Sequence, residues 1–320
     1  MKEYIINKTN ENQRFDKYLK RIMPSASNSF IYKMLRKKNI ELNSKRAKGD
    51  EILKSGDSVK IFFSDETFDK MSGSSKMYSL DEYINAYDSL TGLNIVFEHE
   101  DFMIVYKPEG ILSQKDSPED VSLNEWGIGY LLSTGFVNEN SLKEFKPSVL
   151  NRLDRNTRGL VIFGKTLKGS QRLSEMIKKR SIKKYYFAKT EPGCNLRGTY
   201  KAYLSKNNKT NKVKIYDKTE DIPEGIKYSP ISTAIEVIES NKDYSLLEID
   251  LITGKSHQIR AHLAHLGFPL IGDYKYNGKV ASDAKFQDLV AYKIVFPEID
   301  DEDWKSLSLK TIKINVDKQG

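Results

Sequence analysis

The stretch VLNRLDRNTRGLVIFGK, residues 149–165, places one carboxylate among three arginines. Asp154 lies in a polar loop between two apolar runs, and Arg152, Arg155 and Arg158 flank it in sequence. Because nearby cations favour the ionised form of a carboxylate, we expect Asp154 to be an anion. An ionised Asp154 could act as a charged nucleophile, and the arginines around it could form an anion-binding site. A surface ion-pair cluster is the alternative that these residues leave open.

Several other chemistries lack their residue patterns. The chain has no Walker sequence, no GxGxxG motif after a strand and no GxSxG elbow. His257, His262 and His265 follow an HxxxxHxxH spacing that has no nearby catalytic Glu, so we expect no metal there. The single cysteine, Cys194, excludes an intrachain disulfide. A carboxylate with arginines and tyrosines remains, and it can act at a glycosidic carbon or on a pyrimidine ring.

Positive charge is concentrated in two regions of the chain. Residues 1–63 hold 15 Lys and Arg against 7 Asp and Glu, and residues 143–214 hold 20 against 4. Such segregation suits a polyanion such as nucleic acid, although solvated lysine-rich faces are the alternative. The first residues lack the layout of a signal peptide, and no apolar run approaches the roughly 18 residues of a membrane span. We therefore expect a cytoplasmic protein that does not contact a membrane.

The strands and helices that must position Asp154 can be predicted from the sequence pattern. This pattern indicates an α+β fold around a largely antiparallel sheet with flanking helices. Strand patterns recur without a regular alternation of strand and helix, at residues 95–97, 102–106, 182–190 and 246–252. At 320 residues the chain is long enough for two domains. The composition changes abruptly to Ser, Asp and Gly after residue 63. We therefore expect a domain at 1–64, a linker at 65–90 and a catalytic domain at 91–320.

Residues 1–64 predict a small α/β unit with two short helices. Ser27 or Asn28 is a candidate cap for the second helix, and the polar face of that helix would carry Lys33, Arg36 and Lys37. At the level of pattern, this unit resembles the RNA-binding domain first described in ribosomal protein S-four. A generic basic adaptor domain is the alternative. We expect the three basic residues to contact RNA phosphates.

Four motifs of the larger domain resemble those of one enzyme family. NRLDRNTRGLVIFGKT resembles the HRLDxxTSGLLxxAK signature of the RluA-type pseudouridine synthases, and YKPEG resembles their NKPxG. KKYYFAKTEPG resembles KxYxAxVxG, and TGKSHQIRAHLAHLGFPLIGDYKY resembles TGRTHQIRxHLxxxGxPxxGDxxY. The resemblance implies a pseudouridine synthase-like mixed sheet and isomerisation of specific uridines in structured RNA without a cofactor. The departures fall at Asn151, Arg158 and Lys255, and none removes a group that the reaction needs.

The resemblance also implies roles for individual residues. Asp154 would be the nucleophile, Tyr186 would lie over the uracil, and Arg260 would pair with Asp154. Arg152 would hold the target nucleotide out of its stack. Further RNA contacts are expected from a set of basic and polar side chains, namely Lys107, Arg158 and His257.

We therefore interpret the chain as a monomeric RNA pseudouridine synthase, with large-subunit ribosomal RNA a more favoured substrate than transfer RNA. An RNA-binding ribosome-assembly factor that uses the same fold without turnover is the alternative. The intact Asp154, Tyr186 and Arg260 argue against it. An RNA methyltransferase is a third interpretation, and it is weakened by the lack of a glycine-rich cofactor loop.

Overall fold

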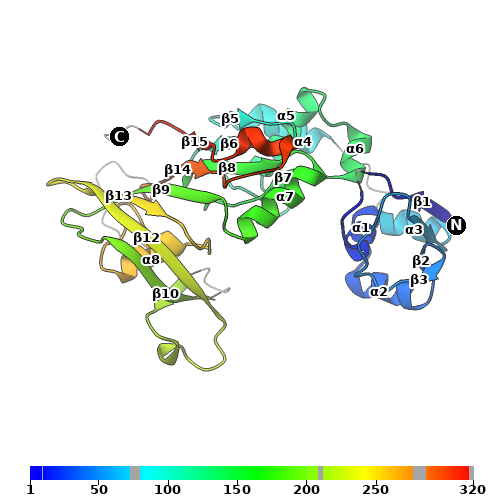
Figure 1. Cartoon of the computed structure of the whole chain (residues 1–320), viewed down its shortest axis with the longest axis horizontal. Helices are drawn as coiled ribbons and strands as arrows, with labels where there is room; N and C mark the ends of the chain where they lie inside the picture. Colours follow the sequence, from blue (N-terminus) through cyan, green and yellow to red (C-terminus); the bar gives the residue numbers. More distant parts are fainter. Residues whose placement is uncertain (9, 73–79, 208–211, 277–285, 317–320) are drawn as a thin grey trace. The chain divides into compact units, whose positions relative to one another are not determined.

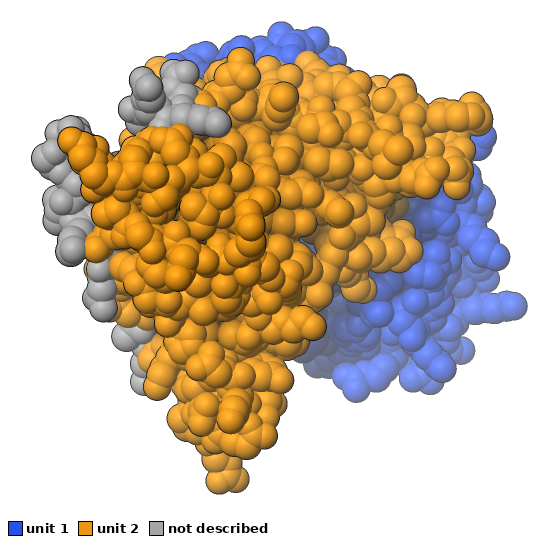
Figure 2. All heavy atoms as spheres, turned by 60° about the vertical axis from the view of Figure 1, so that its left-hand side comes forward, with its two compact units in different colours: residues 1–89, 125–148, 165–170 blue, residues 90–124, 149–164, 171–320 orange. Residues whose placement is uncertain are grey.

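The computed structural model describes residues 1–8, 10–72, 80–207, 212–276 and 286–316 (Figure 1). These residues form two compact units, coloured separately in Figure 2. Unit 1 comprises residues 1–89, 125–148 and 165–170, and unit 2 comprises residues 90–124, 149–164 and 171–320. Within the described ranges, the structure has no helix whose length and apolar character would let it cross a membrane.

The N-terminal part of unit 1 is a four-stranded antiparallel sheet, ordered β1-β4-β2-β3, with two helices packed on it. Apolar side chains at helical spacing bury one face of each helix. Of the two candidate caps, the structure selects Ser27, whose hydroxyl accepts a hydrogen bond from the Phe30 N–H at 3.2 Å. The elements are β1 (Lys2–Ile5), α1 (Phe15–Ile22), α2 (Asn28–Arg36), β2 (Ile40–Leu42), β3 (Lys45–Arg46) and β4 (Ser58–Ile61).

Much of the predicted linker at 65–90 is helical. It contains α3 (Asp65–Ser72) and α4 (Asp81–Ser89), while residues 73–79 lie outside the described residues. Phe68 of α3 joins the core of the N-terminal part. In α4, Tyr83 packs so closely on Gly129 that a Cβ on the glycine would lie 2.1 Å from the Tyr83 carbonyl oxygen. The apolar pattern of these helices is weak in the sequence because each of them buries only one or two large side chains.

The described strands of unit 2 form one large sheet, and the predicted α+β class with a largely antiparallel sheet is confirmed. The strand order is β11-β10-β12-β13-β9-β14-β8-β6-β5, with β15 beside β14 and β7 beside β8. The β14–β8 pair is parallel. The strands are β5 (Asn94–Glu98), β6 (Phe102–Lys107), β7 (Ser148–Val149), β8 (Arg158–Gly164), β9 (Lys183–Thr190), β10 (Gly198–Asn207), β11 (Lys212–Tyr216), β12 (Tyr228–Ser240), β13 (Ser245–Asp250), β14 (Leu289–Val295) and β15 (Thr311–Lys313).

Helices and short 3-10 turns complete the two units. In unit 2, α8 lies against the β10–β12 end of the sheet, where Ala261 packs with Leu204, Ile215 and Ile231 (Figure 1). This helix begins at Gln258, directly after His257, which has a left-handed backbone conformation. The remaining elements are α5 (Leu123–Ser133), α6 (Glu139–Glu144), α7 (Leu167–Lys178), α8 (Gln258–His265), η1 (Thr219–Asp221), η2 (Tyr274–Tyr276) and η3 (Glu302–Leu307).

Candidate active site

The loop that carries Asp154 is held by buried side chains from the segment before it. The Ser113 hydroxyl accepts a hydrogen bond from the Leu153 N–H at 3.0 Å and donates one to the Leu153 carbonyl at 2.9 Å. On the other side of Asp154, the Lys107 ammonium donates to the Arg155 carbonyl at 3.0 Å. Both neighbours of Asp154 are therefore anchored, which fixes the direction of its side chain.

Lys107, expected among the RNA contacts, is instead fully buried. Its ammonium donates to three backbone carbonyls, those of Pro108, Ile111 and Arg155, at 2.8, 2.8 and 3.0 Å. Burial lowers the pKa of Lys107 to about 7, against the opposing effects of the Asp154 and Glu109 carboxylates. Because its three donors are all used inside the protein, Lys107 supports the Asp154 loop and does not reach RNA.

The strand that leaves the loop requires a glycine at its start. Gly159 pairs with Ala291 where β8 and β14 run parallel. A Cβ on Gly159 would lie 2.2 Å from the Ala291 carbonyl oxygen, and its φ of 125° is one that side chains disfavour. The close approach of the two strands therefore depends on Gly159. The pairing of these strands in turn sets the position at which the Asp154 loop ends.

Arg260 of α8 joins two carboxylates. Its Nη1 donates to Asp154 Oδ2 at 2.9 Å, while Nε and Nη2 donate to the two Asp273 oxygens at 2.7 and 2.8 Å. The Asp273 side chain is 1% exposed and that of Asp154 is 27% exposed. Asp273 therefore orients the guanidinium, and the remaining donor holds Asp154 at the surface of the pocket.

Gln258 and His257 shape the turn that precedes α8. The Gln258 side chain is buried, donating to Thr233 and accepting from the Thr253 hydroxyl at 2.9 Å and from the Lys255 N–H at 3.1 Å. His257 has a φ of 54°, and its Nε2 lies 3.8 Å from Asp154 Oδ2. Burial lowers the pKa of His257, and the Arg260 charge lowers it further, against the opposing effect of Asp154. The net lowering of this pKa favours the neutral imidazole beside the carboxylate.

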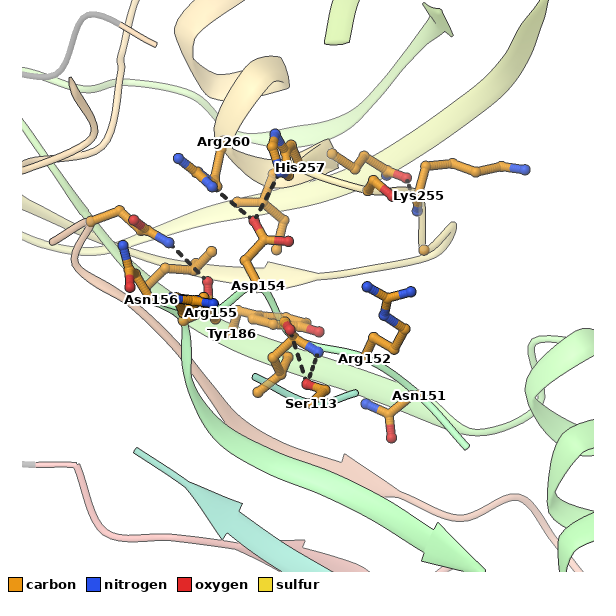
Figure 3. Close-up of a pocket in the computed structure, with 18 of the residues that line it drawn as sticks. Ser113, Asn151, Arg152, Asp154, Arg155, Asn156, Tyr186, Lys255, His257 and Arg260 are labelled. Carbon is orange, nitrogen blue, oxygen red and sulfur yellow. Dashed lines mark hydrogen bonds and ion pairs between the residues drawn. The ribbon is translucent and has the colours of Figure 1, made fainter. Parts of the chain in front are cut away.

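Tyr186 lies beside Asp154 (Figure 3). It is 5% exposed and projects from β9, where it pairs with Ile249 and Ala291 of the neighbouring strands. Burial raises the pKa of the Tyr186 hydroxyl, and the Asp154 carboxylate raises it further. The phenol therefore keeps its proton at neutral pH and can donate a hydrogen bond.

These groups line a pocket with a volume of about 890 Å³. Arg260 and His257 approach the Asp154 carboxylate from the same side, and Arg152 stands apart from that pair (Figure 3). The Arg152 side chain is 63% exposed and lies 3.9 Å from Asp116. The structure thus brings five of the predicted residues to one pocket, namely Arg152, Asp154, Tyr186, His257 and Arg260.

Arg158, predicted to bind RNA, does not line this pocket. Its guanidinium lies 3.3 Å from Asp288 and 3.5 Å from Glu109. Arg158, the first residue of β8, is thus paired with two carboxylates that also lie outside the lining of the pocket. A direct contact between Arg158 and RNA has no support in this geometry.

Three supporting residues were not predicted from the sequence. Ser113 follows the YKPEG motif by three positions, Gln258 lies within TGKSHQIR, and Asp273 lies within GDYKY. Their position in or beside a motif was the only feature of the sequence that could have indicated a supporting role. Their roles depend on partners that are distant in sequence, which a local pattern does not reveal.

In this site a carboxylate, held by an arginine, lies beside a buried tyrosine in a pocket of a large, mostly antiparallel sheet. Residues 101–265 match the model of the family described as RNA pseudouridylate synthase. The chain therefore belongs to the RNA pseudouridylate synthase family, and it is an isomerase that converts uridine in RNA to pseudouridine.

Individual relatives agree with this assignment. The chain is 32% identical to an RNA pseudouridine synthase of Mycoplasma capricolum, over 93% of both chains. It is 30% identical to ribosomal large subunit pseudouridine synthase C of Rickettsia felis, over 89% of this chain and 88% of the relative. Human RNA pseudouridylate synthase domain containing 4 has the same fold, with a TM-score of 0.53 and 19% identity over 68% of this chain and 88% of the human one.

Proposed function

We propose that Asp154 is the catalytic nucleophile and that the substrate is large-subunit ribosomal RNA. The observation that carries the first part is the pairing of Asp154 with Arg260 at 2.9 Å inside the pocket. The Rickettsia relative, named for the ribosomal large subunit, supports the second part.

The reaction breaks the C–N glycosidic bond of uridine, turns the uracil and joins its C5 to C1′. An ionised Asp154 can attack the sugar or the ring, or remove a sugar proton, and each route uses its carboxylate. Arg260 holds one oxygen of this carboxylate, and Asp273 in turn orients Arg260. The Tyr186 ring retains the detached uracil while it rotates. Arg152, exposed at the pocket, holds the target nucleotide out of its stack.

Residues 1–64 are proposed as an S-four-like RNA-binding domain, with the catalytic domain starting at residue 91. Two observations support this proposal. The core of the N-terminal part draws its buried side chains from residues 6–68. Lys33, Arg36 and Lys37 are all exposed at the end of α2.

Mapping of pseudouridine tests the proposed substrate. RNA from cells with and without the protein is compared at single-nucleotide resolution, and the purified enzyme is then given the unmodified transcript. We expect the loss of defined sites in large-subunit ribosomal RNA and their restoration in vitro. Sites lost only from transfer RNA would contradict the proposed substrate and leave the family assignment intact.

Substitution of Tyr186 separates its ring from its hydroxyl. Tyr186→Phe keeps the stacking surface, and Tyr186→Leu removes both, so we expect a larger fall in the rate of pseudouridine formation for Leu. Loss of the aromatic face is expected to lower the rate by up to about tenfold, because an aromatic contact contributes about 0.5–1.5 kcal/mol. Equal losses in both variants would instead assign the essential role to the hydroxyl. A wild-type rate in both would remove Tyr186 from the mechanism.

Removing the positive charges at the exposed end of α2 tests whether the N-terminal domain binds RNA. The triple variant Lys33→Gln, Arg36→Gln, Lys37→Gln should bind RNA more weakly, and the slope of log affinity against log salt should fall by about 0.7–0.9 for each phosphate that the helix no longer binds. A matched triple variant removes the same charge from exposed lysines that already pair with carboxylates, namely Lys143, Lys179 and Lys305. Equal slopes for the two triple variants would show that α2 does not touch the RNA backbone.

A further inference from the structure

Lys184 lies on the same strand as Tyr186 and two residues before it. Side chains two apart on a strand share a face, so both point to the pocket, and Lys184 is among the residues that line it. Its neighbour Lys183 projects to the opposite face and is exposed. The Lys184 side chain is half-buried, whereas Lys206 and Lys255, which also line the pocket, are exposed.

The Lys184 ammonium is a partly buried cation without a counter-charge. Among the residues that the structure describes, it has neither a hydrogen-bond acceptor nor a carboxylate partner, whereas Lys189 pairs with Asp288 and Lys293 with Glu248. Burial alone lowers the pKa of Lys184. Holding an unpaired charge in this environment costs free energy, which a bound anion would offset.

The ammonium lies beside Gly254, which starts the GKSH segment, and both residues line the pocket. Lys184 Nζ lies 3.8 Å from the position that a Cβ would take on this glycine. Uracil and ribose are neutral groups, and the phosphodiester is the anionic part of RNA. A lysine binds phosphate as a point charge and tolerates several approach directions.

We propose that Lys184 binds the phosphodiester adjacent to the target uridine and so holds the RNA strand at the pocket that Tyr186 and Asp154 line. This proposal rests on the proposed function, because it requires RNA in the pocket. Lys184 would act as a binding residue, and it would take no part in the chemical step.

Lys184→Gln is compared with Lys183→Gln in the full-length enzyme. The two substitutions remove the same charge from adjacent positions of one strand, and only the first faces the pocket. The probe is large-subunit ribosomal RNA transcribed in vitro. Single-turnover formation of pseudouridine is measured against enzyme concentration at several salt concentrations, which gives a half-saturating concentration and a maximal rate for each condition.

For Lys184→Gln we expect a higher half-saturating enzyme concentration and a maximal rate within about twofold of wild type. The salt slope, meaning the slope of log half-saturating concentration against log salt concentration, should fall by about 0.7–0.9. Lys183→Gln should keep the wild-type slope, and Lys184→Arg should restore it. Thermal unfolding of Lys184→Gln should occur at the wild-type temperature or higher, because an uncompensated charge is removed.

A salt slope for Lys184→Gln equal to that of Lys183→Gln would overturn the proposal. A lower maximal rate with unchanged half-saturation would also overturn it, because Lys184 would then act on the reacting uridine. If the wild-type enzyme forms no pseudouridine in this RNA, the proposed substrate fails. That result is separate from any difference between the two lysine variants.

Discussion

Asp154→Asn is expected to abolish pseudouridine formation, with a fall of at least about 10⁴-fold, the scale seen when an enzyme loses its nucleophile. A neutral amide cannot serve as nucleophile or base. The fold should be little affected, because Arg260 keeps both of its bonds to Asp273 and the Asp154 side chain is 27% exposed. We expect the free energy of unfolding to change by less than about 1 kcal/mol. Pseudouridine, RNA affinity and urea denaturation are measured on the same preparation.

Asp116→Asn is the matched control for this experiment. Asp116 lines the same pocket, is 68% exposed, and loses the same charge on substitution. It should retain turnover. Substantial pseudouridine formation by Asp154→Asn would refute the mechanism. A loss of several kcal/mol of stability, with activity falling only as folded protein is lost, would instead assign Asp154 a structural role.

Arg260→Gln is expected to remove activity and to lower the free energy of unfolding by about 3–5 kcal/mol. The loss of stability follows from Asp273, whose carboxylate is 1% exposed and would lose the bidentate partner that compensates its charge. The loss of activity follows from Asp154, which would no longer be held by Nη1. Urea denaturation measures the first effect, and pseudouridine formation at saturating RNA measures the second.

The double variant Arg260→Gln, Asp273→Asn separates the two effects. Removing both charges eliminates the buried uncompensated carboxylate, so it should be more stable than Arg260→Gln by about 1–3 kcal/mol. Activity should remain absent, because Asp154 still lacks its partner. Arg172→Gln serves as a control, since its partner Asp301 is 52% exposed and water can solvate the carboxylate. Turnover by the double variant would show that Arg260 does not position Asp154.

Local patterns in the sequence were sufficient for the elements and for the location of the chemistry. The alternation around Tyr186 predicts a strand, and the strand is present as β9. The cap at Ser27 was also visible, because capping joins residues three apart. The carboxylate among arginines led to Asp154, and the four motifs led to the family. In each case the interacting residues are neighbours in the chain, or the motif is contiguous.

The direction of each charged side chain was decided only by the tertiary structure. Arg152 and Arg158 flank Asp154 in sequence, yet only Arg152 reaches the pocket, because Arg158 starts β8 and meets Glu109 and Asp288. Lys107 was expected to contact RNA, but it is buried against three carbonyls.

The pairing that completes the site is likewise a property of the tertiary structure. Asp154 and Arg260 are 106 residues apart in the sequence and meet at 2.9 Å. Residue types and their order determined that a carboxylate, a tyrosine and an arginine were available to this protein. Which of its many cations would be paired, buried or left facing the RNA was decided by long-range packing, since the free energy of a charge depends on the partners and the water that the folded chain leaves around it.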